Sequence, residues 1–312
     1  MENKGQNEKG IIILSTTGRG MCGGTDATLD TNAPKRIVSN EMFLFNVTSV
    51  LGIPDNIKSG DRDLHEPLEY VSAFAAAAGS GTFLFLEKCF GFRKRGGSIS
   101  KWAFVDSPVF PSLAAVVREY DLAKNNGYHS KTHGLPDNFG GSADIRYAGG
   151  ERISFSDNQS PVISYAVGTA VAETFENAMK GEPVALPDVS ALEAIRFYEK
   201  RDNGGFTEAT LTLYPDGTGR NEKRARSGDP KIYESVKTVS AETVAEIKEK
   251  IADTGILAWA ELPDNGFSFG GGKKLTFVFS NGREITVTSG KILPDQISGG
   301  FFDIELELVT NN

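Results

Sequence analysis

Apolar and polar residues alternate strictly in the stretch KKLTFVFSNGREITVTS near the end of the chain, a pattern that predicts a β-hairpin with one buried face. A two-residue loop would place Phe277 opposite Thr286 and leave the apolar side chains without apolar partners. A three-residue Ser-Asn-Gly loop places Phe277 opposite Ile285 instead. We therefore expect the longer loop, with Gly282 in the left-handed conformation that glycine adopts easily.

The same pattern occurs once earlier in the chain, in SADIRYAGGERISFS. Its register pairs Ile145 with Ile153, and Gly150 takes the left-handed position of the turn. A Leu-Pro-Asp-Asn sequence precedes each hairpin, at residues 135–138 and 262–265. In chain order, the aligned positions are Ala143, Ile145, Tyr147, Gly150, Ile153 and Phe155 in the first hairpin, and Leu275, Phe277, Phe279, Gly282, Ile285 and Val287 in the second.

The alignment extends toward the N-terminus into a helix and a strand. The helix positions that align are Leu113, Val117 and Leu122 with Ile247, Ile251 and Ile256. Further upstream, residues 67–81 align with residues 191–205. The two copies then span residues 68–181 and 192–309, a period that is too long for a solenoid repeat and suits two tandem domains.

The second copy shows its elements most clearly. Residues 208–226 predict a hairpin in which Pro215 and Gly217 form the turn, and residues 231–239 predict a further strand. Ser240 is the expected N-cap of a helix that ends at Gly255. The first copy repeats these elements, with its helix near residues 112–120.

These elements predict an α+β protein of two tandem homologous domains, each an antiparallel sheet (meander plus hairpin) with helices on one face. The first domain is expected at residues 68–186 and the second at residues 187–312. Residues 1–67 form an N-terminal segment, whose strands GIIILST and EMFLFNVTSV are expected to complete the first sheet.

The chain resembles a loose group of uncharacterised bacterial proteins, many of them described as hypothetical or as putative lipoproteins. These proteins combine a β-meander, a helix that ends in a Trp-containing segment, and a hairpin with a Gly-containing turn. The matching residues here are Leu257-Ala258-Trp259, the following 262–265 segment and Ser280-Asn281-Gly282. The resemblance supports the α+β fold and a bacterial origin, and it implies no activity.

Composition narrows the classes of partner. The chain has 312 residues, 39% of them hydrophobic and 24% charged, as in an ordinary globular protein. A net charge of −8 disfavours nucleic acid and anionic lipid surfaces as partners. No apolar stretch approaches the roughly 20 residues that span a bilayer, and the start MENKGQNEKG is no signal peptide. The default location is therefore cytoplasmic, or the cell envelope if a leader was removed.

Three histidines could hold a transition metal. His65, His129 and His133 together with water would form an open tetrahedral zinc site, and the spacing of the last two suits one face of a helix. However, Gly127 and Gly134 flank this pair and the segment carries no HExxH motif. The alternative is that both are solvated histidines in a loop.

Two other features are candidates for chemistry. Cys22 lies in a glycine-rich segment beside Arg19 and is a conceivable nucleophile, although no histidine lies nearby in the sequence. Basic runs also occur at equivalent places in the two copies and would bind a small anion. They contain Arg93, Lys94 and Arg95 in the first copy, and Arg224 and Arg226 in the second. The alternative is that these charges protect exposed strands from aggregation.

Features found in only one copy are the better functional candidates, because the shared fold does not require them. The insertion at residues 125–134, which contains two of the histidines, is such a feature. We expect a non-catalytic binding or protein-interaction protein that has no cofactor and binds an unknown protein or a small anionic ligand. The alternative is a metal-dependent or hydrolase-like enzyme that uses this insertion.

Overall fold

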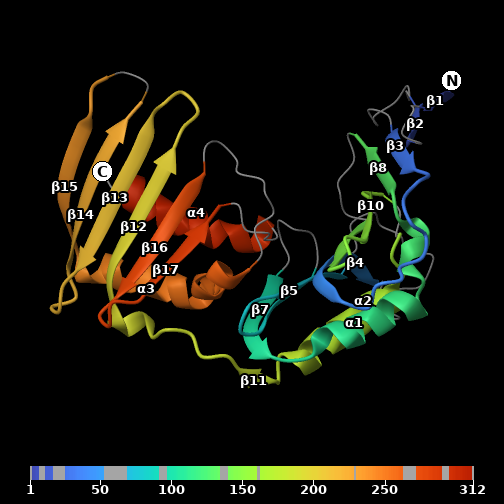
Figure 1. Ribbon diagram of the computed structural model, residues 1–312, viewed down its shortest axis with the longest axis horizontal. Coiled ribbons are helices and arrows are strands. Elements are labelled where there is room, and N and C mark those ends of the chain that lie inside the picture. Colours follow the sequence, from blue (N-terminus) through green and yellow to red (C-terminus); the bar gives the residue numbers. More distant parts are fainter. Residues whose placement is uncertain are drawn as a thin grey trace. The chain divides into compact units, whose positions relative to one another are not determined.

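The computed structural model describes residues 2–6, 11–16, 25–52, 69–90, 97–133, 140–159, 162–227, 230–262, 272–289 and 295–310. The chain forms two compact units. The first contains Met1–Ala77 and Gly81–Pro183, and the second contains Ala78–Ser80 and Val184–Asn312. Each unit has its own sheet and its own helices (Figure 1).

The first unit consists of eleven strands, two α-helices and one 3-10 helix among the residues described. Its elements are β1 (Glu2–Gln6), β2 (Ile11–Thr16), β3 (Thr25–Asp30), β4 (Met42–Gly52), β5 (Glu69–Ala77), β6 (Thr82–Phe90), β7 (Gly97–Asp106), α1 (Val109–Glu119), η1 (Leu122–Asn125), β8 (Tyr128–Thr132), β9 (Gly141–Tyr147), β10 (Arg152–Asp157), α2 (Tyr165–Ala178) and β11 (Glu182–Pro183).

The second unit has one smaller sheet. Its elements are η2 (Val189–Ala191), β12 (Leu192–Lys200), β13 (Phe206–Leu213), β14 (Gly219–Arg226), β15 (Tyr233–Val239), α3 (Ala241–Thr254), η3 (Ile256–Glu261), β16 (Lys273–Phe279), β17 (Glu284–Thr288) and α4 (Asp295–Thr310). None of the helices described in either unit is long and apolar enough to cross a membrane.

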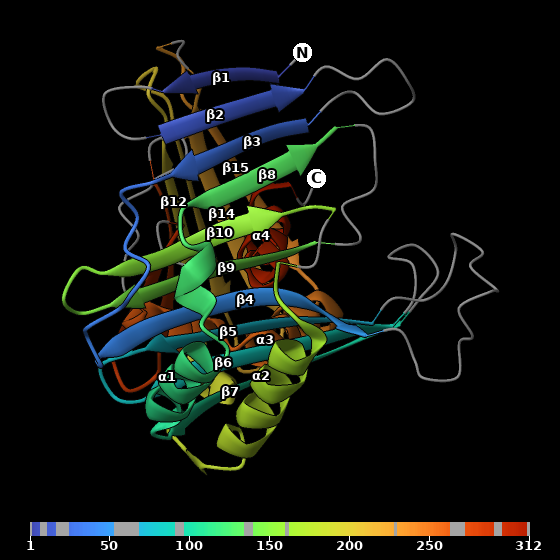
Figure 2. The same cartoon turned by 90° about the vertical axis from the view of Figure 1, so that its right-hand side faces the viewer.

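The fold is α+β, as the sequence predicts. The strand order of the first sheet is β1-β2-β3-β8-β10-β9-β4-β5-β6-β7-β11, and that of the second is β15-β14-β13-β12-β16-β17. Neighbouring strands are antiparallel except for β8 and β10, which are parallel. In the first unit α1 and α2 cover one face of the sheet around β4 to β7 (Figure 2). Phe45 and Val47 of β4 and Leu113 and Phe175 of the helices belong to the core between these layers.

The two sheets share one topology. The order β10-β9-β4-β5-β6-β7 in the first matches β17-β16-β12-β13-β14-β15 in the second, and a helix follows the fourth meander strand in both units. Strand β12 therefore corresponds to β4, because each lies between a hairpin and the rest of a meander. The alignment of residues 67–81 with residues 191–205 is wrong, since it pairs β12 with β5. The first strand of the first meander instead comes from the N-terminal segment.

Backbone irregularities support this correspondence. The pairing of β4 with β9 shifts register between Met42 and Leu44, and that of β12 with β16 shifts between Leu192 and Ala194. A β-bulge of this kind bends a strand and redirects the side chains beside it. The same bulge thus lies at the same point of both sheets.

The turn and cap predictions are confirmed. Phe277 lies opposite Ile285, and Ile145 lies opposite Ile153. The φ angles of Gly150 and Gly282 are 84° and 78°. Ser240 caps α3 by accepting a hydrogen bond from the backbone N–H of Thr243, and Gly255 ends this helix with a φ of 62°.

Candidate functional site

Several residues singled out in the sequence lie outside the described part of the chain. They are Cys22, His65, Arg93, Lys94 and Arg95. The proposed basic run of the first copy and one member of the histidine triad therefore stay predictions. The remaining candidates can be placed.

Arg224 and Arg226 lie on β14, and groups of their own unit surround them. Arg224 is 3.9 Å from Glu208 and 3.5 Å from Glu234, and Arg226 donates a 2.5 Å hydrogen bond to the carbonyl of Gly204. Both guanidinium groups also lie over the ring of Phe206, at 5.6 and 5.5 Å from its centre. Both cations therefore already have partners within the unit. Strand β14 lies between β13 and β15, so its charges do not protect a free sheet edge.

The 125–134 insertion is not the solvated loop that the sequence suggested. Most of it forms η1 and the strand β8, which pairs with β10 on one side and with β3 on the other. His129 and His133 are four positions apart along this extended segment, a separation of about 13 Å. Each has a separate partner. His129 Nδ1 lies 3.0 Å from Ser156 Oγ, and His133 Nε2 lies 2.9 Å from Asp26 Oδ2. The structure does not bring the two imidazoles together, and no metal-binding group of His, Cys, Asp or Glu occurs among the described residues.

The contact between Ser156 and His129 has part of the geometry of a nucleophile and its base. Burial lowers the pKa of His129, and the nearby charge of Arg152 lowers it further. The imidazole is therefore neutral at pH 7 and can accept a proton. However, among the described residues no carboxylate hydrogen-bonds to this histidine, so the group that would orient it is missing from the arrangement.

A different site lies beneath the segment that connects β3 to β4. This segment, residues 31–41, is called the strap below, and it is anchored to the β9–β10 region at several points. The two carboxylate oxygens of Glu151 accept hydrogen bonds from the backbone N–H groups of Val38 and Ser39, at 2.8 and 2.7 Å. The N–H of Ala148 donates to the carbonyl of Glu41 at 2.8 Å.

Asn126 anchors the other end of the strap. Its side-chain amide donates to the carbonyls of Pro34 and Arg152 at 2.9 and 2.8 Å, and its oxygen accepts from the N–H of Ser154 at 2.7 Å. Lys35 donates to the backbone carbonyl of Asn126 itself. Asn126 is only 2% exposed, so this network is buried and its polar groups are satisfied within the protein.

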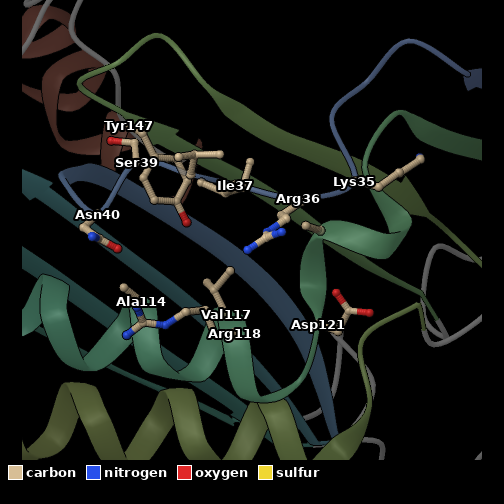
Figure 3. A pocket seen from close by; sticks show the side chains of 12 residues that line it. Lys35, Arg36, Ile37, Ser39, Asn40, Ala114, Val117, Arg118, Asp121 and Tyr147 are labelled. Atoms are coloured by element: carbon tan, nitrogen blue, oxygen red, sulfur yellow. The ribbon is translucent and has the colours of Figure 1, made fainter.

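The strap and α1 enclose a pocket of about 340 Å³ (Figure 3). We call it the arginine–tyrosine pocket, after Arg36, Arg118 and Tyr147. Its other lining residues are Lys35, Ile37, Val38, Ser39, Asn40, Ala114, Val117, Asp121 and Ala123. The volume lies at the lower end of the roughly 300–1,000 Å³ that is typical of small-molecule sites.

Tyr147 is the buried polar residue of this pocket. Its side chain is 3% exposed, and its hydroxyl forms no hydrogen bond with any described residue. The hydroxyl points into the space between the strap and α1 (Figure 3). Burial raises the pKa of Tyr147 to about 12, the negative charge of Glu151 raises it too, and Arg118 opposes the shift. The phenol is therefore neutral at physiological pH and retains a proton to donate.

Two cations without partners flank the tyrosine. Arg36 lies on the strap and Arg118 lies in the last turn of α1, and both side chains are exposed. Within the described residues, neither guanidinium group forms an ion pair or a hydrogen bond. In Figure 3 both extend along the same space as the tyrosine hydroxyl. The pocket thus presents several N–H and O–H donors that have no acceptor within the part of the chain that the structure describes.

At the equivalent positions, the second unit has no counterpart of the Tyr147 hydroxyl or of the Arg118 guanidinium group. Phe279 corresponds to Tyr147, because each is the last residue of its hairpin strand and each lies opposite the residue before the bulge. Ala252 corresponds to Arg118, since their carbonyls accept the hydrogen bond that closes each helix, at 3.3 and 3.2 Å. The sequence alignment of the two hairpins contains this signal, because it pairs Tyr147 with Phe279.

Asp121 also differs from its counterpart. It has a left-handed backbone, with a φ of 49°, and it corresponds to Gly255, whose φ is 62°. It is the one non-glycine residue with a positive φ in the described part of the chain. Left-handed backbone is tolerated best by Gly, Asn and Asp, so the first unit keeps the conformation while it places a carboxylate at the edge of the pocket.

A second, wider pocket of about 730 Å³ lies on the other side of the strap and is lined by His129, Arg152 and Glu151 among others. Asn126 and Glu151 in its wall are already hydrogen-bonded to the backbone, as described above. The backbone at Gly127, in the wall of this pocket, is also tightly packed, because a Cβ there would lie 2.7 Å from the carbonyl oxygen of Asp30. These groups hold the strap in place, so the arginine–tyrosine pocket is the better candidate for ligand binding.

Comparisons with known proteins do not define a family for this chain. No protein-family model and no curated protein sequence matches it. Among solved structures, the chain is similar to Aeromonas veronii immune modulator A, with 10% identity, 85% of this chain and 93% of that chain covered, and a TM-score of 0.11. A TM-score this low supports no inference about fold or function.

Proposed function

We propose that this protein is a non-catalytic binding protein whose first unit binds a small organic anion in the arginine–tyrosine pocket. The observation that carries the proposal is the Tyr147 hydroxyl, which belongs to a buried ring, opens into the pocket and lacks a hydrogen-bond partner among the described residues. Buried polar groups in proteins almost always have a hydrogen-bond partner, so a donor left open in a pocket indicates a ligand that accepts from it.

The neighbouring charges define the ligand as an anion. A guanidinium group offers N–H donors in a planar fork that matches carboxylate and phosphate oxygens. Arg36 and Arg118 can supply two such forks, and the neutral phenol of Tyr147 adds an uncharged donor. The chain as a whole carries a net charge of −8, so two arginines that have no ion-pair partner among the described residues contrast with the average charge of the protein.

We further propose that the two units arose by tandem duplication and that only the first has a ligand site. The shared strand order and the shared bulge support a common origin. The replacement of Tyr147 and Arg118 by Phe279 and Ala252 supports the difference in function, since the scaffold does not require either polar side chain.

The proposal is tested by isothermal titration calorimetry with acetate, sulfate and inorganic phosphate at low ionic strength. At least one of these anions should bind the wild-type protein with a stoichiometry of one. Tyr147→Phe should weaken binding about 5–30-fold, and Arg36→Gln or Arg118→Gln about 10–100-fold, as expected for the loss of a neutral or a charged hydrogen bond. Arg220→Gln is the control, because Arg220 is half-exposed and pairs with Glu222 on β14. Equal binding by all four variants would refute the proposal.

A hydrolase-like enzyme is the second candidate, and the contact between Ser156 and His129 is the observation in its favour. A fluorophosphonate probe reacts with activated serine side chains. Labelling of wild-type protein that is lost in Ser156→Ala and in His129→Gln would support this function. Absence of labelling would return the pair to a structural role in joining β8 to β10.

A further inference from the structure

The apolar wall of the arginine–tyrosine pocket narrows the class of ligand. Ile37 and Val38 of the strap and Ala114 and Val117 of α1 lie between the charged groups. Val117 is 4% exposed and Ala114 is 8% exposed, so α1 presents little free surface. Val38, in contrast, is 79% exposed, the largest value among the exposed large hydrophobic residues of the described chain. Together with Ile37, Ala114 and Val117 it gives the pocket a continuous apolar wall that an apolar group of a ligand can cover.

The strap holds Val38 in this exposed position. The backbone N–H groups of Val38 and Ser39 both donate to the carboxylate of Glu151. These two hydrogen bonds fix the backbone conformation at Val38. The side chain therefore cannot turn inward without breaking a contact with a carboxylate, which is stronger than one with a neutral acceptor.

The charges in the pocket favour a monoanion. Arg36 and Arg118 supply two positive charges that have no ion-pair partner among the described residues, whereas Lys35 is already bonded to the carbonyl of Asn126. Asp121 adds a negative charge to the lining, and the charge of Glu151 also acts on Tyr147. These two carboxylates would repel a phosphate dianion more strongly than they would repel the single charge of a carboxylate ligand.

We infer that the ligand is an amphipathic monocarboxylate, with its carboxylate at Arg36, Arg118 and Tyr147 and a short apolar body against Ile37, Val38 and Val117. This inference rests on the proposed function, because it assigns a chemical class to the anion of the same site. The pocket volume of about 340 Å³ limits the apolar body to a short chain or a single ring.

The test is a chain-length series measured by calorimetry with acetate, butanoate and hexanoate, with inorganic phosphate and hexan-1-ol as further probes. Burial of each added methylene should increase affinity about threefold, so hexanoate should bind at least about 20-fold more tightly than acetate. Hexan-1-ol should not bind, since it lacks the carboxylate. Val38→Ser should reduce the gain in affinity from acetate to hexanoate. Val236→Ser on β15 is the matched control, because Val236 is also exposed, at 59%, and lies in the other unit.

The possible outcomes separate this inference from the proposed function. If acetate or phosphate binds in a manner that depends on Tyr147, but hexanoate binds no more tightly than acetate, the inference is overturned and the proposed function stands. If hexan-1-ol binds as tightly as hexanoate, the site is apolar rather than anionic and both proposals are overturned. If no probe binds in a manner that depends on Tyr147, both are likewise overturned.

Discussion

Tyr147 and Phe279 occupy the same position in the two units and differ by one hydroxyl group. Each ends the first strand of its hairpin, and the backbone N–H of each donates to the carbonyl four residues later, at 3.0 Å in both cases. Both rings are buried, at 3% and 2% exposure. The fold thus needs an aromatic ring here, whereas the hydroxyl is present only where Arg118 lies beside it.

The hydroxyl of Tyr147 should make the protein sensitive to alkaline pH. Its pKa is about 12 in the folded chain and 10.0 as a reference. Above pH 10 the unfolded chain loses the phenol proton while the folded chain retains it, so the free energy of unfolding falls as the pH rises from 10 to 12. The loss attributable to this group is at most about 2–3 kcal/mol. Urea unfolding across this window should show a smaller loss for Tyr147→Phe than for wild type. Equal losses would mean that the phenol is not buried as described.

Asn126 should be essential to the strap. Asn126→Ala removes three hydrogen bonds and leaves the carbonyls of Pro34 and Arg152 and the N–H of Ser154 without partners. The free energy of unfolding should fall by about 2–4 kcal/mol, because unsatisfied buried groups add to the lost bonds. Asn125→Ala is the matched control, since Asn125 makes one such bond, to Val162, and should lose only about 1 kcal/mol. Similar losses in chemical denaturation would contradict the role of Asn126 as an anchor.

His129 should titrate below the usual histidine range. Burial is the larger cause of its lowered pKa and the charge of Arg152 is the smaller one. Removal of that charge in Arg152→Gln should raise the pKa of His129 part of the way toward 6.5, and burial should account for the remaining difference. Titration of the imidazole resonances by NMR measures both values. A midpoint at or above 6.5 in the wild-type protein would show that the side chain of His129 on β8 is not buried as described.

The paired turn glycines should respond alike in the two units. Gly150 and Gly282 have positive φ angles, and an added Cβ would meet nothing within 4 Å at either position. Gly150→Ala and Gly282→Ala should therefore each cost about 1–2 kcal/mol through backbone strain alone. At Gly149 no positive φ applies and an added Cβ would make only ordinary contacts with Ser39 and Glu151, so Gly149→Ala should cost less than about 0.5 kcal/mol. If thermal unfolding shows that Gly149→Ala destabilises the protein as much as the other two substitutions do, the assigned turns are contradicted.

The features that the sequence predicted correctly are local. The register of Phe277 with Ile285 depends on the length of one loop, and the ends of α3 depend on Ser240 and Gly255 alone. Each of these choices is made by residues within a few positions of one another, where turn and cap chemistry has few alternatives.

The features that were missed depend on distant pairing. Strand β8 has the sequence YHSKT, which carries no apolar alternation, and it is a strand because β3 and β10 pair with it. The expectation that β4 belongs to the first sheet is confirmed, but the sequence alignment does not match it with β12, the strand to which it corresponds. The strap connects β3 to β4, so its position depends on how both of these strands pair. The arginine–tyrosine pocket therefore could not be assembled from sequence, even though the replacement of Tyr147 by Phe279 was visible in the alignment.

The most direct test of the ligand site is an NMR titration that follows the side-chain Nε–Hε resonances of arginine as hexanoate is added. We expect the resonances of Arg36 and Arg118 to shift in a saturable manner in the wild-type protein, and the shifts to weaken strongly in Tyr147→Phe. The resonances of Arg224 and Arg226 on β14, which already have partners on neighbouring segments, should not move. Saturable shifts at Arg224 and Arg226, or shifts at Arg36 and Arg118 that Tyr147→Phe leaves unchanged, would contradict the account.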